Sequence, residues 1–520
     1  MRIGAATCAA LMSSTLFAPC VLAQNNLPAL GDSVSEDLPV AAERKLGDQI
    51  MREIRRDPDY SDDPVLLEYL ESIWRPLVAQ ARRSGHIGAD TDDRFAWEAF
   101  LVRDRSVNAF ALPGGYVGVH LGLIAMASTR DELASVLAHE MSHVTQRHIA
   151  RSVAASKRAS MLSIASMIVG VLVASRAGRS GGDAANAAIT GGQALAAQGQ
   201  LNFSRDMERE ADRIGMQAMQ GAGFAAGGMA AMFEKLDQTS RLNDSGGFPY
   251  LRSHPLTSER IGEARSRLAS QAGPAAQPEH AIEHAMAQAR ARVLMDPRID
   301  GLRRSQARSG GASPAERLAA AYESALASTL LRDWERADAT LDGAAALLRS
   351  PEAAKEPRAE RALALLAAQS QIDRGAPARV AALIAPYQKE RSRPVVLLAA
   401  QAALAQSDTA ALQRSSDELQ TWVALRGADA QAWTLLSQAF GRLGQPLRAI
   451  RADAEASLAV GDLQGATDRL RAGQRRARGG PDAVRGGVDF IDLSVIDARL
   501  REIEALRKQL VAETREPKSF

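Results

Sequence analysis

The stretch SVLAHEMSHVTQRHIAR, residues 135–151, carries three of the eight histidines in this 520-residue chain. His139 and His143 are four residues apart, so on a helix both imidazoles project from one face. Glu140 directly follows the first histidine, which completes the H-E-x-x-H pattern. In that pattern two imidazoles bind zinc and the glutamate acts on a water molecule. The stretch therefore predicts a helix that carries a catalytic zinc site.

The residues around this motif predict where the helix begins and which histidines face the metal. Thr129 and Glu132 form a T-x-x-E capping box, and Asp131 adds negative charge at the positive helix end. His148 lies five residues beyond His143, which on a continuous helix rotates it off the metal-facing side. We expect His148 to be a surface or capping histidine and not a ligand.

A catalytic zinc takes three protein ligands, so a third must come from elsewhere in the chain. The best candidate lies in NFSRDMEREADRIGMQ, residues 202–217, where Glu208 and Asp212 share a helix face. We expect Glu208 to be the ligand, Asp212 to orient a ligand imidazole, and Glu210 to point away. Ala211 and Gly215 are small enough to let this helix approach the first one closely. The alternative is an ordinary solvated acidic face.

The overall composition is that of a globular, helix-rich protein. Hydrophobic residues make up 46% of the chain and charged residues 24%, whereas aromatic residues make up only 4%. Alanine-rich, aromatic-poor sequence favours helices over sheets. The net charge of +2 gives no electrostatic reason to expect binding to nucleic acid.

The first residues are typical of a secretory signal peptide. Arg2 is followed by a short apolar stretch, and Val21 and Ala23 are small residues before a cleavage point at Gln24. The alternative, a membrane anchor, is less favoured because the apolar run is shorter than the ~20 residues that a span needs. We expect residues 1–23 to be removed. Both cysteines of the chain would leave with them, so no disulfide is expected.

Three zones follow this segment. Helical patterns cover residues 41–56 and 64–83, then RFAWEAFLV (94–102) and GGYVGVHLG (114–122) have strand character, separated by the turn-like RDRSVNAFALP. Helix-forming sequence continues to about Thr239, and glycine, proline and serine between Ser240 and Pro255 indicate a loop. From about Ala281 the chain is almost entirely alanine- and leucine-rich helix.

This last zone predicts tetratricopeptide-like helix pairs, which repeat about every 34 residues. Turn-like breaks recur at Asp333, Gly375, Asp408, Gly444 and Gly461. AWTLLSQAFGRLGQPLRAI (432–450) fits the repeat pattern best, and the alternative is a plain helical bundle. A charged helix, DARLREIEALRKQLVAE (497–513), closes the chain after a linker rich in glycine and arginine.

Three segments in order, HEMSH, SRDMEREAD and SHPLTSERI, resemble the motifs of the HtpX/CAAX-protease group of gluzincin metallopeptidases. With the signal peptide and the repeats, the chain is most similar to a periplasmic subgroup of these proteases. The resemblance implies one Zn²⁺ per chain, with His139, His143 and Glu208 as ligands. It also implies Glu140 as general base and Asp212 as the residue that orients a ligand.

The third segment contributes His254, the histidine of the group's H-P-x-x-x-x-R-[IL] pattern. The resemblance implies that His254 acts as a switch over the zinc. Pro255 biases His254 away from helical geometry, so extended backbone carries its side chain. Two functions stay open: His254 fills the open zinc position and silences the enzyme, or it donates to the oxyanion of the reaction. A third alternative is that it only caps the next helix.

The resemblance also suggests functions for two other segments. VNAFALPGGYVGVHLG (107–122) would supply an edge strand to which an extended substrate can pair. Residues 161–174 carry no charge and are too short to span a membrane, so they form either a membrane-touching element or a lid helix packed on the protein. The glycine-rich stretch 178–193 is suited to a mobile lid.

Together these observations predict a mainly α fold of the α+β class. A helical zincin metalloprotease domain with a small sheet (24–275) is followed by an α-solenoid of helix pairs (281–476), then a linker and C-terminal helix (477–520). The resemblance implies a periplasmic endopeptidase, peripheral to the outer membrane. Its polypeptide substrates would be misfolded or stalled outer-membrane proteins, and its repeats would bind the assembly machinery. The alternative is mainly a chaperone or adaptor with a usually closed zinc site.

Overall fold

The fold is described from a computed structural model, which defines residues 38–155, 204–242, 248–270, 281–350, 355–479 and 487–515. The signal peptide, the apolar segment 161–174 and the glycine-rich stretch 178–193 lie outside these ranges, so the predictions on them stay untested. Within the described ranges, no helix is long and apolar enough to cross a membrane.

The structure is mainly helical with one small sheet, as the composition predicts. The N-terminal part contains α2 (Val40–Arg55), α3 (Pro64–Arg83), α4 (Ala89–Arg94), α5 (Leu121–Met126), α6 (Arg130–Thr145) and α7 (His148–Ala155). It continues with α10 (Arg205–Gly221), α11 (Gly227–Leu242), α12 (Pro249–Ser253) and α13 (Ser258–Ser270). The helices predicted over 41–56 and 64–83 are confirmed as α2 and α3. The region expected to be a loop between Ser240 and Pro255 contains the short helix α12.

The sheet has four strands in the order β1-β2-β4-β3, formed by Tyr60–Ser61, Glu98–Val102, Tyr116–His120 and Ala109–Leu112 respectively. β2 and β4 pair in parallel, whereas β1 and β3 pair antiparallel to their neighbours. Both predicted strands are present as β2 and β4. The turn predicted between them is wrong in part, because it contains β3, and β3 lies at one edge of the sheet.

The largest hydrophobic cluster joins the sheet to most of the surrounding helices, and a second, smaller cluster packs α2 against the strands. The largest cluster contains the inner faces of α3, the strands, α6, α10 and α11, and it includes Tyr250 of α12. α6 lies at its centre, and every residue from Glu132 to Val144 is buried. A helix that is buried all round belongs to the interior of a domain, so its polar side chains require partners or a function.

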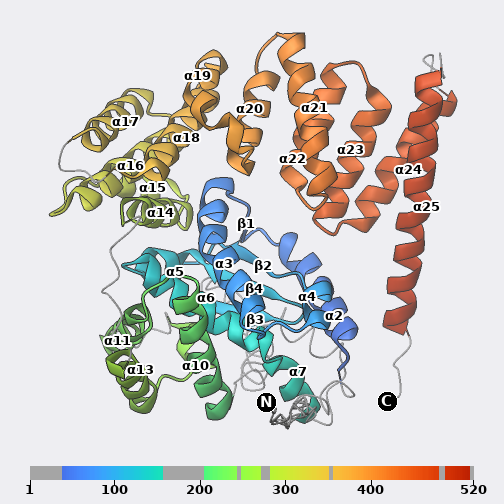
Figure 1. Cartoon of the computed structure of the whole chain (residues 1–520). Helices are drawn as coiled ribbons and strands as arrows, with labels where there is room; N and C mark the ends of the chain where they lie inside the picture. Colours follow the sequence, from blue (N-terminus) through green and yellow to red (C-terminus); the bar gives the residue numbers. More distant parts are fainter. Residues whose placement is uncertain are drawn as a thin grey trace, which may run out of the picture.

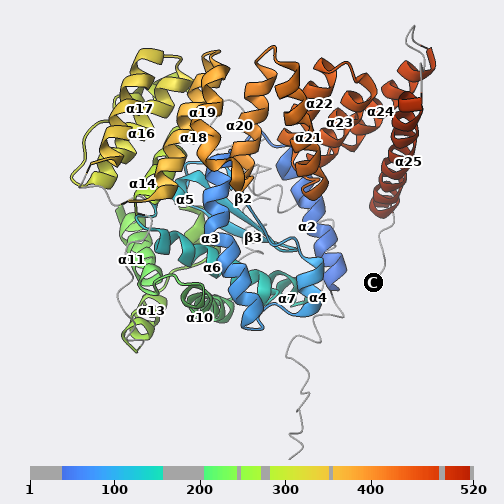
Figure 2. The same ribbon diagram turned by 45° about the horizontal axis from the view of Figure 1, so that its top comes forward.

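The C-terminal part consists of successive antiparallel helices that arch over the N-terminal part (Figure 1 and Figure 2). Its first half is α14 (Ala281–Leu294), α15 (Ile299–Gln306), α16 (Pro314–Leu330), α17 (Trp334–Leu348), α18 (Pro357–Asp373) and α19 (Val380–Ile384). Two 3-10 turns, η1 (Pro377–Arg379) and η2 (Ala385–Glu390), flank α19. Its second half is α20 (Arg393–Leu404), α21 (Thr409–Leu425), α22 (Ala430–Arg442), α23 (Pro446–Ala459), α24 (Leu463–Gly479) and α25 (Gly487–Arg515).

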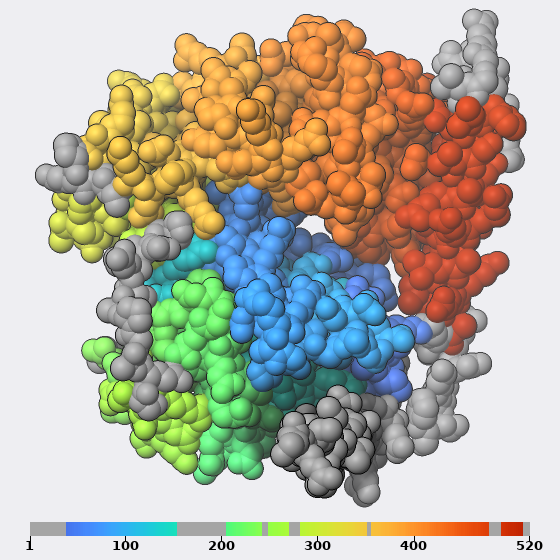
Figure 3. Space-filling model, viewed as in Figure 1, coloured from blue at the N-terminus to red at the C-terminus, as the bar shows by residue number. Residues whose placement is uncertain are grey.

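The helix boundaries in this part agree with the predicted breaks. Asp333 and Asp408 cap the N-termini of α17 and α21, each through a side-chain oxygen that accepts backbone N–H groups. Gly375, Gly444 and Gly461 follow α18, α22 and α23 with positive φ angles of 79°, 71° and 79°. The chain's last described helix is α25, which is longer than the predicted charged helix, and Figure 3 shows an opening between the arch and the N-terminal helices.

Candidate metal centre

The site is built on α6, whose N-terminus is capped as the sequence predicts. The Thr129 hydroxyl accepts the backbone N–H of Glu132 at 3.1 Å. The reciprocal half of the predicted capping box differs, because the Glu132 carboxylate accepts the N–H of Ser128 at 2.7 Å and binds Lys235. Lys235 on α11 therefore ties the start of α6 to a neighbouring helix.

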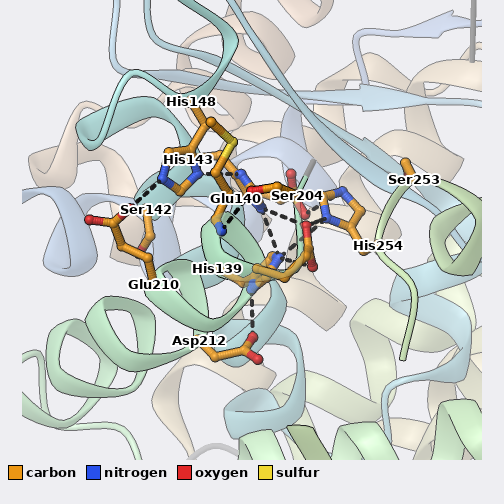
Figure 4. A network of polar contacts seen from close by, with 12 residues as sticks. His139, Glu140, Ser142, His143, His148, Ser204, Glu210, Asp212, Ser253 and His254 are labelled. Atoms are coloured by element: carbon orange, nitrogen blue, oxygen red, sulfur yellow. Dashed lines mark hydrogen bonds and ion pairs between the residues drawn. The ribbon is translucent and has the colours of Figure 1, made fainter. Parts of the chain in front are cut away.

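Four side chains from three separate segments converge in the interior beside α6. His139 and His143 come from α6, Glu208 from α10, and His254 follows α12. Each offers one ligand atom, and all four atoms lie within 4.8 Å of one another. Figure 4 shows the three imidazoles and their carboxylate partners gathered at one point. Two or three imidazoles with one carboxylate form a donor set that suits zinc.

α10 can reach this point because small residues face α6. A Cβ atom at Gly215 would lie 3.1 Å from the carbonyl carbon and oxygen of Ala138 and 3.1 Å from the nitrogen of His139. Ala211 is fully buried on the same face. The close approach predicted from these small residues is confirmed, and it places Glu208 Oε2 3.5 Å from His139 Nε2.

Asp212 and Arg260 support the ligands from the side of α10. Asp212 Oδ1 lies 2.9 Å from His139 Nδ1, and Arg260 binds both Asp212 oxygens at 2.7 and 2.8 Å. Arg260 Nη1 also lies 2.8 Å from Glu208 Oε2. Burial opposes ionisation of Asp212, but Arg260 and His139 hold its pKa below its ordinary value. An ionised Asp212 fixes His139 with its Nδ1–H toward the carboxylate and its Nε2 toward the site.

The charge state of His139 follows from the same contacts. Burial lowers the pKa of His139, but Asp212 and Glu208 raise it more strongly, to about 10. Glu208 itself has a lowered pKa, because burial is outweighed by His254, His139 and His143. The site thus holds two ionised carboxylates in the interior, balanced by cationic side chains. A divalent cation would provide the same balance.

The burial of the Glu140 carboxylate requires an explanation. The side chain is 0% exposed, and among the described residues neither carboxylate oxygen has a hydrogen-bond donor. The nearest ionisable partner is His254, whose Nε2 lies 3.5 Å from Glu140 Oε1. An unsatisfied buried carboxylate costs stability, so its place beside the ligands indicates that it faces water or a substrate.

The interpretation of His148 as a surface or capping histidine and not a ligand is wrong in part. His148 is not among the four converging ligand residues, but its side chain is 0% exposed and its Nδ1 lies 2.8 Å from His143 Nδ1. α6 ends at Thr145, and Arg147 has a φ angle of 50°, so the chain turns back before α7 begins at His148. The expectation that His148 lies at the surface fails because α6 does not continue past Thr145. Glu210, as predicted, is not one of the four converging ligand residues, and its Oε2 lies 3.1 Å from His148 Nε2.

The backbone of His254 is non-helical, as Pro255 predicts, but it is not regularly extended. Its φ and ψ angles are −124° and 78°, which are not helical, and its side chain is buried. Its Nδ1 lies 2.9 Å from Glu208 Oε1 and 3.3 Å from His139 Nε2. His254 is therefore placed as a fourth member of the ligand group.

Two residues beside the site were not predicted to take part in it. Arg260 belongs to the SHPLTSERI segment, so the signal that could have found it was the arginine of that pattern. The ring of Tyr250 stacks on His254 with centroids 4.7 Å apart, and burial raises the pKa of its hydroxyl well above the ordinary value. No sequence pattern indicated Tyr250.

Comparison with known proteins agrees with this geometry. Residues 68–268 match the family described as Peptidase family M48, which confirms the resemblance stated from the motifs. The beta-barrel assembly-enhancing protease of Escherichia coli K12 is 35% identical over 243 residues, 47% of each chain. A Vibrio cholerae protein provisionally given the same name is 38% identical over 289 residues, 55% of this chain and 56% of its own.

A more distant relative matches a smaller share of the chain. The mitochondrial metalloendopeptidase OMA1 of Schizosaccharomyces pombe is 32% identical over 165 residues, 32% of this chain and 44% of its own. The chain spans about half the length of these two curated relatives. The family match over residues 68–268 contains all four converging ligand residues.

Proposed function

Because residues 68–268 match peptidase family M48, we propose that the chain is a zinc-dependent endopeptidase. The observation that carries the proposal is the convergence of His139, His143 and Glu208 beside the unsatisfied carboxylate of Glu140. The three ligands and a nearby acid form the gluzincin pattern of an H-E-x-x-H helix with a distant glutamate.

The residues present fit a zinc ion. Both α6 imidazoles direct their Nε2 atoms to one point, with those atoms 3.0 Å apart, and a carboxylate oxygen reaches each of them within 3.5 Å. A zinc ion bound there would polarise a peptide carbonyl and lower the pKa of a water molecule toward ~7. His139, His143 and Glu208 would hold the ion, and Asp212 would orient His139.

Glu140 acts as the general base in this proposal. Its carboxylate lies in the interior beside the ligands and is free of the hydrogen bonds that would occupy its lone pairs, as far as the described residues go. It is positioned to accept a proton from the attacking water and to pass that proton to the amine that leaves. An amide at this position could bind water but could not accept the proton.

His254 is proposed to regulate access to the site. Its Nδ1 lies close to Glu208 and His139, and its Nε2 lies close to Glu140, so it occupies the space where water and substrate would meet. Neutral imidazole is a good zinc ligand, and we propose that His254 fills the open position until its loop moves. The alternative is that His254 donates to the oxyanion once the site is open.

Substrate polypeptides would bind along β3. This strand lies at the edge of the sheet, pairs with β4 only through its inner side, and packs against α6. An extended peptide could pair with its outer side and pass close to the ligands. The substrate class would then be any chain that presents an extended segment, such as an unfolded or stalled protein.

The cellular role is proposed from the relatives. The Escherichia coli and Vibrio cholerae relatives are named for enhancing beta-barrel assembly, which supports outer-membrane proteins as substrates and the periplasm as location. The helix pairs form an extended surface of the kind that binds partner proteins, which supports contact with the assembly machinery. The second candidate function is a chaperone or adaptor whose site stays closed, and the buried His254 favours it.

A cleavage assay on an unfolded substrate such as casein separates these functions. We expect the wild-type chain to cleave casein and Glu140→Gln to lose the activity while retaining zinc. Equal activity of the two proteins would exclude the enzyme. The metal content of the purified chain, compared with that of Glu208→Ala, tests the ligand assignment without relying on activity.

A further inference from the structure

The turn after α6 brings a further histidine, His148, against the ligand group. Arg147 adopts a left-handed conformation, with a φ angle of 50°, and its guanidinium donates to Glu43 and to the carbonyl of Leu38. A positive φ is strained for a residue with a side chain, so these contacts fix a turn that would not otherwise form. As a consequence, α7 begins at His148, and the His148 imidazole contacts the imidazole of His143.

Three contacts then run outward from His143 in a line. His143 Nδ1 lies 2.8 Å from His148 Nδ1, and His148 Nε2 lies 3.1 Å from Glu210 Oε2. Arg151 Nη1 donates to the same Glu210 oxygen at 2.9 Å. Figure 4 shows His148 and Glu210 on the far side of His143 from Glu140 and His254.

The directions of these hydrogen bonds follow from the chemistry of the groups. A carboxylate can only accept, so His148 donates its Nε2–H to Glu210. A neutral imidazole carries one N–H, so His148 Nδ1 is then an acceptor for the Nδ1–H of His143. With its proton on Nδ1, His143 has a lone pair on Nε2, and that atom faces the ligand group.

We propose that Glu210 and His148 are positioning residues that hold His143 in the tautomer required for binding the metal. Asp212 makes the equivalent contact to His139 directly, at 2.9 Å, so each α6 ligand has its own carboxylate support. In the case of His143, the His148 imidazole lies between the ligand and its carboxylate. That carboxylate, Glu210, is partly exposed. This inference rests on the proposed zinc site.

Zinc affinity of substituted proteins, measured by competition with a chelator, tests the proposal. Glu210→Ala removes the acceptor at the end of the line, and we expect it to weaken zinc binding by about 10-fold, within the range for supporting groups. Glu210→Gln keeps an acceptor oxygen and should retain part of the affinity. Asp206→Asn is the control, because it removes an exposed carboxylate from the same helix and should change nothing.

Double substitutions show whether the residues act along one line. Glu210→Ala and His148→Ala should weaken zinc binding together no more than His148→Ala does alone. Glu210→Ala and Asp212→Asn act on different ligands, so their effects should multiply. Wild-type affinity of Glu210→Ala, or simple multiplication of the Glu210 and His148 effects, would overturn the proposal.

A second measurement does not need the metal or a folded His148 variant. The ¹⁵N chemical shifts of the histidine side chains report which ring nitrogen carries the proton. In the metal-free wild-type protein we expect the proton of His143 on Nδ1, and in Glu210→Ala a mixture of tautomers. An unchanged tautomer in Glu210→Ala would refute the positioning role. Absence of zinc binding by the wild-type protein, with a tautomer that still depends on Glu210, would refute the proposed function instead.

Discussion

Gly215 sets the distance between α6 and α10, the two helices that carry the proposed metal ligands. An added Cβ atom would lie 3.1 Å from the carbonyl group of Ala138 and from the nitrogen of His139. These are backbone atoms of a fully buried helix, so they cannot rotate away as a flexible side chain would. Substitution of Gly215 should therefore push α10, with Glu208 and Asp212, away from α6.

Two opposing contributions, helix propensity and overpacking, determine how Gly215→Ala changes the stability. Alanine is more favourable than glycine in a helix interior by ~1 kcal/mol. Carbon atoms in contact prefer separations of about 3.5–4.0 Å, so Gly215→Ala requires a shift of a few tenths of an ångström. Overpacking of this kind costs about 1–3 kcal/mol. We expect Gly215→Ala to be neutral to mildly destabilising and to weaken zinc binding several-fold, and Gly215→Val to weaken it by at least ~10-fold.

Gly343→Ala on α17 is the matched control, because a Cβ atom there would meet nothing within 4 Å. Gly343→Ala should raise the free energy of unfolding by about 1 kcal/mol through its higher helix propensity. It should leave zinc binding unchanged. The assays are the urea midpoint of the metal-free proteins and zinc affinity by chelator competition. Wild-type zinc affinity of Gly215→Val, or an equal stabilisation by the two alanine variants, would refute the argument that this close approach positions the ligands.

The other substitutions test individual roles. Glu140→Gln should keep zinc and lose hydrolysis, because the amide cannot accept a proton; loss of the metal would make Glu140 a ligand instead. Asp212→Asn should weaken zinc binding by about 10–100-fold, and unchanged affinity would reduce Asp212 to an ordinary helix carboxylate. His254→Ala should raise casein cleavage if His254 blocks the site, whereas a fall by about 10²–10³-fold with zinc retained would make it an oxyanion donor.

Features that depend on a few adjacent residues could be predicted from the sequence. The spacing of His139 and His143 fixes their common face once the stretch is helical, and the Thr129 cap gives the start of that helix. The same holds for Glu208 and Asp212 on α10. Small residues on α10 predicted its close approach, because the space that a side chain needs is a local property.

Features that depend on partners distant in the chain could not be predicted. β3 is four residues long and contains no β-branched residue, so only its pairing with β4 shows that it is a strand. His148 was misplaced because the turn before it depends on contacts of Arg147 with Glu43 and Leu38, about 100 residues away. No local pattern contains that information.

The domain boundary predicted at about residue 280 also depends on contacts between residues that are distant in the chain. α14 begins at Ala281 and belongs to both parts: Ala287 and Ala291 pack into the cluster around α6, whereas Met286 and Val293 pack into that of the first repeat helices. His284 on α14 lies 2.5 Å from the hydroxyl of Tyr69 on α3. A chain that ended near residue 278 would therefore expose part of the protease core, and one that ended after α14 would not.

Ion pairs also join the C-terminal helices to α3 and to the two residues directly before it. Arg290 binds Asp63 through two hydrogen bonds of 2.7 Å, Arg393 binds Asp62 at 2.7 Å, and the guanidinium of Arg361 contacts Glu68. The Arg290–Asp63 pair is the most buried of the three, so removing one of its partners would leave a charge without compensation, at about 3–5 kcal/mol. Movement of the C-terminal helices away from the N-terminal part would break all three contacts at once. Displacement of these C-terminal helices would therefore strain α3, which packs directly against α6 and α10, the helices that carry His139, His143 and Glu208.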